Sequence, residues 1–246
     1  MRGVRRVLVA GCAAWLCLAA PVLAQGDDFE AHLAAAEQGN AEAQYQLGHD
    51  YYYSRKHKDD VLARKWFEAA GKQGHAQGAY EAAVMYSLGE GGPVDHKRAM
   101  ELYQQAAEGG YLRAYGDIGL IYRNGEGVAA DIKESVRWFR KGADAGDAQS
   151  MRFLGEALMN GEGVEKNVLQ GIAWIERGAN LNDAACEVRM AELYYNGEGV
   201  KQDNSRAFMW AQRAAEHGSA TGYYYVGIMD ENGQGIPYAR SAFAEQ

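Results

Sequence analysis

The polar residues that perform chemistry in enzymes are plentiful in this 246-residue chain, but their spacing matches no catalytic pattern. The sequence contains no His-Glu-x-x-His pair for zinc, no Gly-x-Ser-x-Gly turn for a nucleophilic serine and no glycine loop ending in Lys-Ser or Lys-Thr for phosphate. Its six histidines lack the short spacings of metal ligands. Carboxylate pairs such as Glu156 and Glu162 indicate a solvated face, because acidic residues occur throughout. We therefore predict no catalytic residue, no metal site and no cofactor.

Two further features have a chemical interpretation and a stronger structural one. Gly125-Glu126-Gly127 has glycines like those of a nucleotide-binding loop, but no strand precedes it and the same glycines recur along the chain. Cys186 is the single cysteine after residue 24, so it has no partner for an internal disulfide. No histidine is near Cys186 in sequence, which favours a buried structural thiol over a nucleophile.

The recurrence of those glycines at a fixed distance is the strongest signal in the sequence. Gly-x-Gly followed by Val or Ile begins at Gly125, Gly161, Gly197 and Gly233, at intervals of 36 residues, and a degenerate copy begins at Gly89. A fixed period of this length is typical of proteins built by stacking one small unit many times.

Three other kinds of residue follow the same period, and each has a structural meaning. An Asp or Asn before a helical run caps the helix by accepting a backbone N–H bond, and a Gly or Asn after it supplies a left-handed C-cap. The capping positions are Asp95, Asp131, Asn167 and Asp203. The turn positions are Gly74, Gly110, Gly146, Asn182 and Gly218. The large apolar positions between them are Trp66, Leu102, Trp138, Trp174 and Trp210.

Between each cap and turn lies a helix that carries the tryptophan near its middle. Small residues follow four positions later, which allows close helix packing. We interpret Trp66, Trp138, Trp174 and Trp210 as structural core residues packed between helices, and we expect Trp138→Ala to cost about 3–5 kcal/mol of stability.

A second helix precedes each glycine loop. Its marker is an apolar residue, a small residue and then Tyr at positions i, i+1 and i+4, as in Ile118, Gly119 and Tyr122, which places all three on one helical face. Each unit is therefore a helix, a glycine loop, a second helix and a glycine turn. Such a pair cannot bury its apolar face alone, but stacked neighbours can.

These residues resemble Sel1-like repeats, a branch of the tetratricopeptide-like helical repeats. The resemblance implies an all-α fold, an α/α right-handed superhelical solenoid of helix pairs. It divides the chain into a capping helix at 25–40, a solenoid over 41–236 and a C-terminal cap or tail at 237–246. The expected units are 41–75, 76–111, 112–147, 148–183, 184–219 and a partial unit at 220–236.

The N-terminus has the three parts of a secretory signal peptide. Three arginines, Arg2, Arg5 and Arg6, precede an apolar run that is too short for a membrane-spanning helix and ends at a small-residue exit before Gln25. We expect cleavage after Ala24 and export to the periplasm of a Gram-negative cell or secretion. No later apolar run approaches spanning length, so we expect no transmembrane segment in the mature chain.

The charge balance limits the classes of partner. The whole chain has 25 Lys and Arg against 33 Asp and Glu, and without residues 1–24 the balance is −11. An acidic surface does not attract nucleic acid or an anionic membrane, so we predict that nucleic acid is not a partner.

A stacked solenoid offers an extended concave surface, usually lined by the first helix of each unit. The face opposite the packing marker carries Tyr and Arg residues, which are common at binding hot spots. An equally open alternative is that the tyrosines only pack, because Tyr suits half-buried positions. The candidate partner-binding residues are Tyr45, His49, Tyr80, Arg123, Arg152, Glu156, Glu192, Tyr195 and Tyr224.

Two functions follow as expectations. The first is a non-catalytic periplasmic scaffold, adaptor or regulator that binds a partner protein on the concave surface. The alternative is a cell-wall or β-lactam-directed hydrolase or binder, by analogy with cysteine-rich Sel1-like relatives. Those relatives use a regular cysteine pair in each repeat, and this chain lacks the pairs. Fold alone does not choose between the two.

Overall fold

The structure, a computed structural model, describes residues 28–233. The predicted signal peptide at 1–24 and the predicted tail at 237–246 lie outside these residues. Within them the chain forms twelve α-helices and no β-strand. The helices are α1 (Phe29–Glu37), α2 (Ala41–Tyr53), α3 (Asp60–Lys72), α4 (Ala76–Leu88), α5 (His96–Glu108), α6 (Arg113–Asn124), α7 (Ile132–Ala145), α8 (Ala148–Asn160), α9 (Val168–Ala179), α10 (Ala184–Asn196), α11 (Asn204–Glu216) and α12 (Ala220–Glu231).

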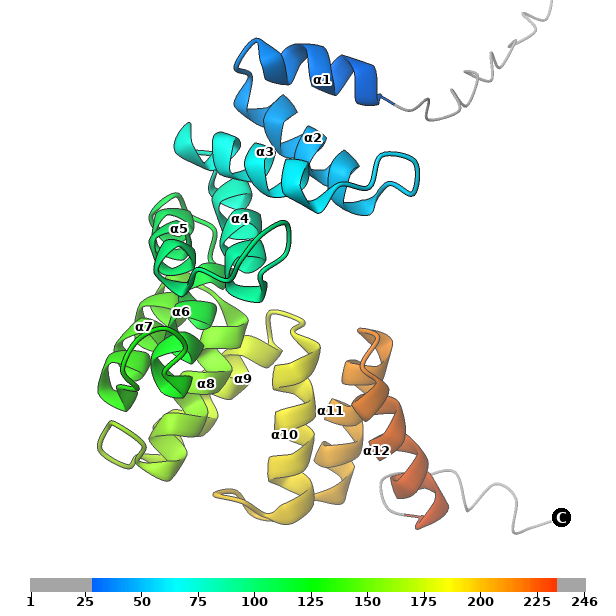
Figure 1. Ribbon diagram of the computed structural model, residues 1–246. Coiled ribbons are helices and arrows are strands. Elements are labelled where there is room, and N and C mark those ends of the chain that lie inside the picture. Colours follow the sequence, from blue (N-terminus) through cyan, green and yellow to red (C-terminus); the bar gives the residue numbers. More distant parts are fainter. Residues whose placement is uncertain (1–27, 234–246) are drawn as a thin grey trace, which may run out of the picture.

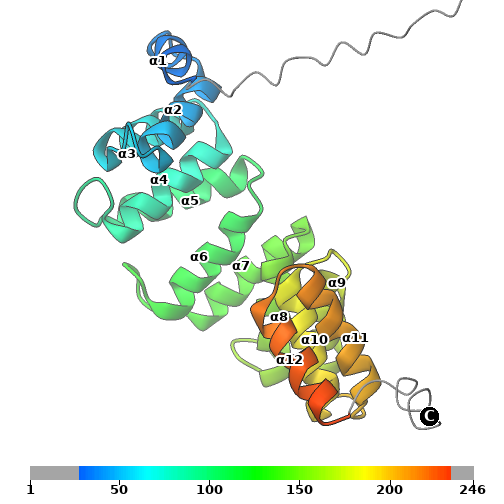
Figure 2. The ribbon, with the colours of Figure 1, turned by 90° about the vertical axis from the view of Figure 1, so that its right-hand side faces the viewer.

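The helices stack in chain order (Figure 1), and their main contacts join neighbours along the chain. Five helix pairs follow the single helix α1, and α12 is the first helix of a further unit. Figure 2 shows the same succession from the side, from α1 at one end to α12 at the other. The prediction of an all-α solenoid of helix pairs is confirmed. We call the even-numbered helices the first helices and α3, α5, α7, α9 and α11 the second helices.

The predicted caps are present at every second helix. Asp95, Asp131, Asn167 and Asp203 each accept a hydrogen bond from the backbone N–H three residues later. Asp59 does the same for α3, although its loop lacks the glycines. These contacts are local, so a side chain of the right type at the right position is enough to begin the helix.

The repeated glycines serve two purposes. Asn182, which replaces glycine in one turn, has a φ of 64°, so this turn needs a left-handed residue, as the sequence predicted. Gly119 has a helical backbone and is required for space, because a side chain there would collide with the ring of Phe139 on the second helix. Gly48 and Phe67 have the same relationship in the first unit.

The tryptophans are only half-buried, and the fully buried residue is the next one along the helix. Phe139, after Trp138, has an exposed fraction of 2%. Trp138 packs against the core cluster that contains Ile118, and a cation, Lys141, lies 4.0 Å from its ring centroid. The expectation that the tryptophans are complete core plugs is therefore corrected. Each one packs at the edge of the cluster that precedes its helix, with one side toward solvent. Besides Trp138, the tryptophans packed in this way are Trp66, Trp174 and Trp210.

Candidate functional site

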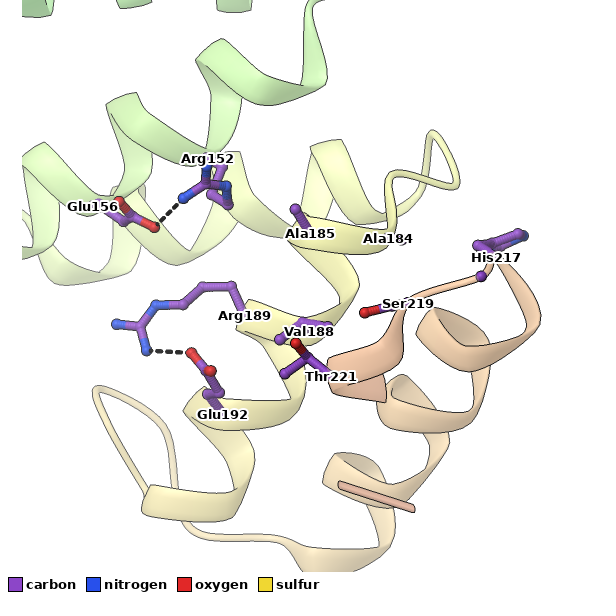
Figure 3. A pocket seen from close by; sticks show the side chains of 11 residues that line it. Arg152, Glu156, Ala184, Ala185, Val188, Arg189, Glu192, His217, Ser219 and Thr221 are labelled. Atoms are coloured by element: carbon purple, nitrogen blue, oxygen red, sulfur yellow. Dashed lines mark hydrogen bonds and ion pairs between the residues drawn. The ribbon is translucent and has the colours of Figure 1, made fainter. Parts of the chain in front are cut away.

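The first helices α8, α10 and α12 enclose the pocket drawn in Figure 3. Its volume is about 430 Å³. The helices α8 and α10 contribute most of the lining side chains, and the turn before α12 contributes the opposite wall. The lining residues are Arg152, Glu156, Ala184, Ala185, Val188, Arg189, Glu192, His217, Gly218, Ser219 and Thr221.

The charged residues of this pocket are held in pairs by the helices that carry them. Arg152 donates to Glu156 one turn later on α8, at 2.8 Å. Arg189 pairs with Glu192 on α10 at 3.3 Å and with Glu198 in the following loop at 2.9 Å. Figure 3 shows both intrahelical pairs facing the pocket. The pocket therefore presents fixed donors and acceptors beside apolar side chains, an arrangement that suits a polar chain such as a peptide.

A second pocket, of about 420 Å³, continues this surface toward α6. It shares Arg152 and Ala185 with the first pocket, so the two form one hollow, which we call the groove. The groove runs along the first helices from α6 to α12. The lining residues of the second pocket are Arg113, Asp147, Ala148, Gln149, Arg152, Asp183 and Ala185.

Three predicted binding residues, Arg152, Glu156 and Glu192, lie together in the groove. Tyr45 and Tyr80 do not, because both are in the core with an exposed fraction of 7%. Their assignment as partner-binding residues is therefore corrected, and their burial agrees with the alternative that the tyrosines only pack. Burial raises the pKa of the Tyr45 hydroxyl to about 12.

Packing against later elements explains this burial. The ring of Tyr45 stacks on that of His75, with centroids 4.5 Å apart. The hydroxyl of Tyr80 donates to Asp117 at 2.8 Å, and Tyr111 covers its ring. Tyr80 therefore packs in the core, below the residues that face solvent.

The other predicted residues lie outside the groove. His49 is half-buried, with its Nε2 2.9 Å from the Tyr45 hydroxyl, and burial lowers the pKa of its imidazole. Arg123 is exposed and pairs with Glu162 at 3.7 Å. Tyr195 packs near Tyr225 at the C-terminal end.

Tyr224 shares that end of the solenoid with Tyr195 and Tyr225. Its side chain is 64% exposed and packs near the ring of Tyr225. Neither pocket of the groove includes Tyr195 or Tyr224 among its lining residues.

Sequence reasoning missed several residues of the groove. Arg113 and Gln149 lie in the first turn of α6 and α8, and Ser219 and Thr221 flank the start of α12. The predicted positions lie further along each first helix, whereas these four residues lie in or beside its first turn. Extending the same 36-residue register back to the helix starts would have found them.

A buried carboxylate supports the wall at α12. Glu187 on α10 is fully buried, and its carboxylate lies 3.1 Å from Nη2 of Arg213 and 2.7 Å from Nδ1 of His217. Both partners come from the end of α11 and the turn after it. The cluster ties this turn to α10, so the turn is held in place beside the groove.

The groove has the chemistry of a binding surface. The Ser219 hydroxyl accepts a hydrogen bond from the backbone N–H of Gly222 and so caps α12. Figure 3 shows the ring of His217 pointing away from Ser219. Cys186 is fully buried and donates to the carbonyl oxygen of Ala148 at 3.3 Å, and burial raises the pKa of its thiol. Within residues 28–233 no group of His, Cys, Asp and Glu is arranged to hold a metal ion.

The part of the chain that the structure describes also contains no helix with the length and apolar character needed to cross a bilayer.

The comparisons with known proteins agree with the repeat found in the sequence. The family model described as Sel1 repeat matches residues 41–75, 76–111, 112–147, 148–183 and 184–219. No curated protein matches the chain.

Solved structures share the fold. A protective antigen of uropathogenic Escherichia coli, with an SLR fold, is 30% identical with a TM-score of 0.72, over 85% of this chain and 45% of that one. The chain therefore spans less than half the length of that antigen. A Sel1 repeat protein from Oxalobacter formigenes is 24% identical with a TM-score of 0.71, over 85% and 90% of the two chains.

An immunity protein from Pseudomonas aeruginosa is more distant. It is 18% identical with a TM-score of 0.56, over 74% of this chain and 67% of that one. This likeness concerns the fold alone. From the five matched repeats and the stacked helix pairs, we conclude that the chain belongs to the Sel1 repeat family, whose members are generally non-catalytic scaffolds for protein interactions.

Proposed function

We propose that this protein is an exported, periplasmic scaffold or adaptor that binds an extended segment of a partner protein in the groove over α6, α8, α10 and α12. The observation that carries the proposal is the groove itself, in which two pockets of about 430 and 420 Å³ meet at Arg152 and Ala185. The family supports it, since Sel1 repeats are generally interaction scaffolds.

The lining of the groove suits a peptide. Its fixed arginines and carboxylates, together with Gln149, Ser219 and Thr221, supply both donors and acceptors for a polypeptide backbone. Ala184, Ala185 and Val188 supply apolar contacts between them. Rigid, mixed surfaces of this kind bind with a small entropy cost, because the helices already hold the side chains in place.

The alternative is a cell-wall or β-lactam-directed hydrolase. The groove contains a serine and a histidine, but the Ser219 hydroxyl caps α12 and forms no hydrogen bond with His217 among the described residues. No contact of the groove favours a nucleophile. Turnover of nitrocefin or peptidoglycan by purified residues 25–246 would contradict the scaffold proposal.

Photocrosslinking in the living cell tests the scaffold proposal directly. A photoreactive residue is placed at Ala185, where the two pockets meet, and in a control at Leu169, which is 76% exposed on α9 outside the groove. We expect Ala185 to crosslink a protein that Leu169 does not. The purified pair should then bind, and Thr221→Arg, which fills the groove wall, should weaken that binding at least about tenfold. Equal crosslinking from both positions contradicts the proposal.

Export is tested separately. Osmotic fractionation of cells that express the full chain should release the protein with the periplasmic fraction. Its N-terminal residue should be Gln25, because we expect cleavage after Ala24. A protein retained in the cytoplasm with an intact N-terminus would contradict the export proposal and leave the groove proposal unaffected.

A further inference from the structure

The start of α6 departs from the pattern that begins the other first helices of the repeats. In those helices the residue after the turn caps the helix with its side chain, as Asn40, His75, Asp147, Asp183 and Ser219 do. At the equivalent position α6 has Tyr111, and its N-cap residue, Leu112, makes no side-chain capping bond. A lost cap costs about 1 kcal/mol, and such departures from a local rule occur preferentially at functional sites.

The replacement lies two residues before Arg113, which lines one end of the groove. The ring of Tyr111 packs against that of Tyr80, with centroids 4.6 Å apart. Two residues later, the guanidinium of Arg113 lies 6.0 Å from the Tyr80 centroid and lines the groove beside Arg152. The aromatic pair therefore forms a platform next to Arg113.

Arg113 and Arg152 have donors with no acceptor. Arg113 forms no hydrogen bond or ion pair with any residue in 28–233. Arg152 donates from Nη1 to Glu156, but its Nε is buried and has no partner among the described residues. Arg113 is exposed, so its donors are open to solvent or to a partner, whereas a buried donor without a partner, such as Nε of Arg152, is rare in folded proteins.

The nearby carboxylates already have partners of their own. Asp147 accepts the backbone N–H of Ser150 at 2.7 Å, and Asp183 accepts that of Cys186 at 2.8 Å. Asp117 accepts the hydroxyl of Tyr80. None of these three carboxylates is hydrogen-bonded to Arg113 or Arg152 among the described residues. A carboxylate from a partner would form the strongest bonds with the two arginines.

Burial raises the pKa of the Glu81 and Asp117 carboxyls, and the positive charge of Arg113, which both carboxylates attract, opposes that rise. Neither carboxylate forms an ion pair with the guanidinium among the described residues. The N–H groups of Arg113, which is exposed, therefore remain available to a partner.

We propose that Arg113 and Arg152 together bind the carboxylate of one aspartate or glutamate side chain in the partner segment. This inference rests on the proposed function of the groove. The net negative charge of the chain, −8 at pH 7, disfavours a strongly acidic partner, so the segment carries a single acidic residue among neutral or basic ones. Arg113 and Arg152 then fix the position of the segment along the groove.

A peptide selection tests the inference. Random twelve-residue peptides, displayed with a neutral constant sequence after them so that no terminal carboxylate is near, are selected on purified residues 25–246. The same selection is made on Arg113→Gln and on Lys141→Gln, a control cation that lies over Trp138 outside the groove. Arg113→Gln should fold normally, because the guanidinium makes no hydrogen bond within the described residues, and a thermal melt checks this.

We expect the wild type and Lys141→Gln to select peptides with Asp or Glu at one recurrent position, and Arg113→Gln to select peptides without it. A synthetic peptide from the wild-type selection should lose about tenfold or more in affinity for Arg113→Gln, and as much for the wild type when its acid becomes an amide. The two changes together should cost little more than either alone, because they remove the same contact.

Three outcomes would overturn the inference. Peptides that bind in the groove without an acid preference, or with Lys or Arg at the recurrent position, contradict it while leaving the proposed function intact. An acid preference that persists in Arg113→Gln also contradicts it. If no peptide is selected, or if Thr221→Arg binds every peptide as well as the wild type does, the proposed function fails and the inference fails with it.

Discussion

A Cβ atom on Gly163 would lie 2.7 Å from the carbonyl oxygen of Ile132, the first residue of the second helix in the preceding repeat. Gly163 is the second glycine of its loop and has a φ of 68°. The loop of one repeat therefore rests directly on the backbone that begins the preceding second helix. The glycine is needed twice, for its backbone conformation and for the close approach.

We expect Gly163→Ala to lower the free energy of unfolding more than the same substitution at a turn glycine does. Gly74→Ala is the control, because Gly74 also has a left-handed φ, of 87°, but nothing lies within 4 Å of its added Cβ. The control should cost about 1–2 kcal/mol from backbone strain alone. Gly163→Ala should cost about 1–3 kcal/mol more from the collision. Urea denaturation followed by circular dichroism measures both, and equal costs would contradict the inter-repeat contact.

Because the tryptophans are only half-buried, replacing the smaller Phe139 should destabilise the protein more than replacing the larger Trp138. We expect Phe139→Ala to cost about 3–5 kcal/mol, because its ring is almost completely buried. Trp138→Ala should cost less, about 2–3 kcal/mol, because one side of the indole faces solvent and Lys141. Thermal and urea denaturation of the two variants test the order. An unchanged melt for Trp138→Ala would show that the tryptophan does not hold the repeats together.

Glu81 should make stability depend on pH. Burial raises the pKa of its carboxyl above the ordinary value of 4.5, and the charge of Arg113 opposes that rise. The folded chain therefore binds this proton more tightly than the unfolded chain does. The resulting stabilisation is complete below about pH 4.5 and is lost as pH rises through the raised pKa.

Replacing Glu81 with Gln removes this titration and sacrifices no hydrogen bond among the described residues. We expect the stability of Glu81→Gln relative to the wild type to increase between about pH 4 and about pH 7. Glu108→Gln, at an exposed position at the end of α5, is the control and should show a smaller change. A relative stability that falls as pH rises would contradict the sign.

The cluster at Glu187 predicts a non-additive pair of substitutions. Arg213→Ala should cost about 3 kcal/mol, because it leaves a fully buried carboxylate with only His217 beside it. Adding Glu187→Gln to Arg213→Ala should recover part of that loss, since no charge then remains buried. Urea denaturation of the single and double variants measures the coupling, and simple additivity would argue against a buried ionic tie.

Much of the fold could be predicted from the sequence because its signals are local. Asp131 caps α7 through a bond to Glu134 three residues later, and Asn182 takes the left-handed turn within its own neighbourhood. Such features need no knowledge of distant contacts. They recur every 36 residues, so their repetition also indicated a stacked array.

The binding residues were harder to predict. Arg152, Glu156 and Glu192 were found because they lie mid-helix on the face opposite the packing marker. Arg113 was missed because it lies in the first turn of α6, and the first turns of the first helices were left out of the predicted positions. The absence of a capping residue at position 111 was visible in the sequence, but its meaning depends on Tyr80, which lies 31 residues earlier.

The sequence by itself determined the repeat, the helix boundaries and the left-handed turns, because each depends on residues a few positions apart. Only the tertiary structure decided which of the equivalent positions face a partner. Tyr80 and Arg152 occupy the same register, two periods apart, yet Tyr80 is buried and Arg152 lines the groove. The difference arises because exposure depends on what the residues about 30 positions later, at the end of the same repeat, place against each side chain. At Tyr80 this is the ring of Tyr111, whereas Arg152 is left facing the hollow between α8 and α10.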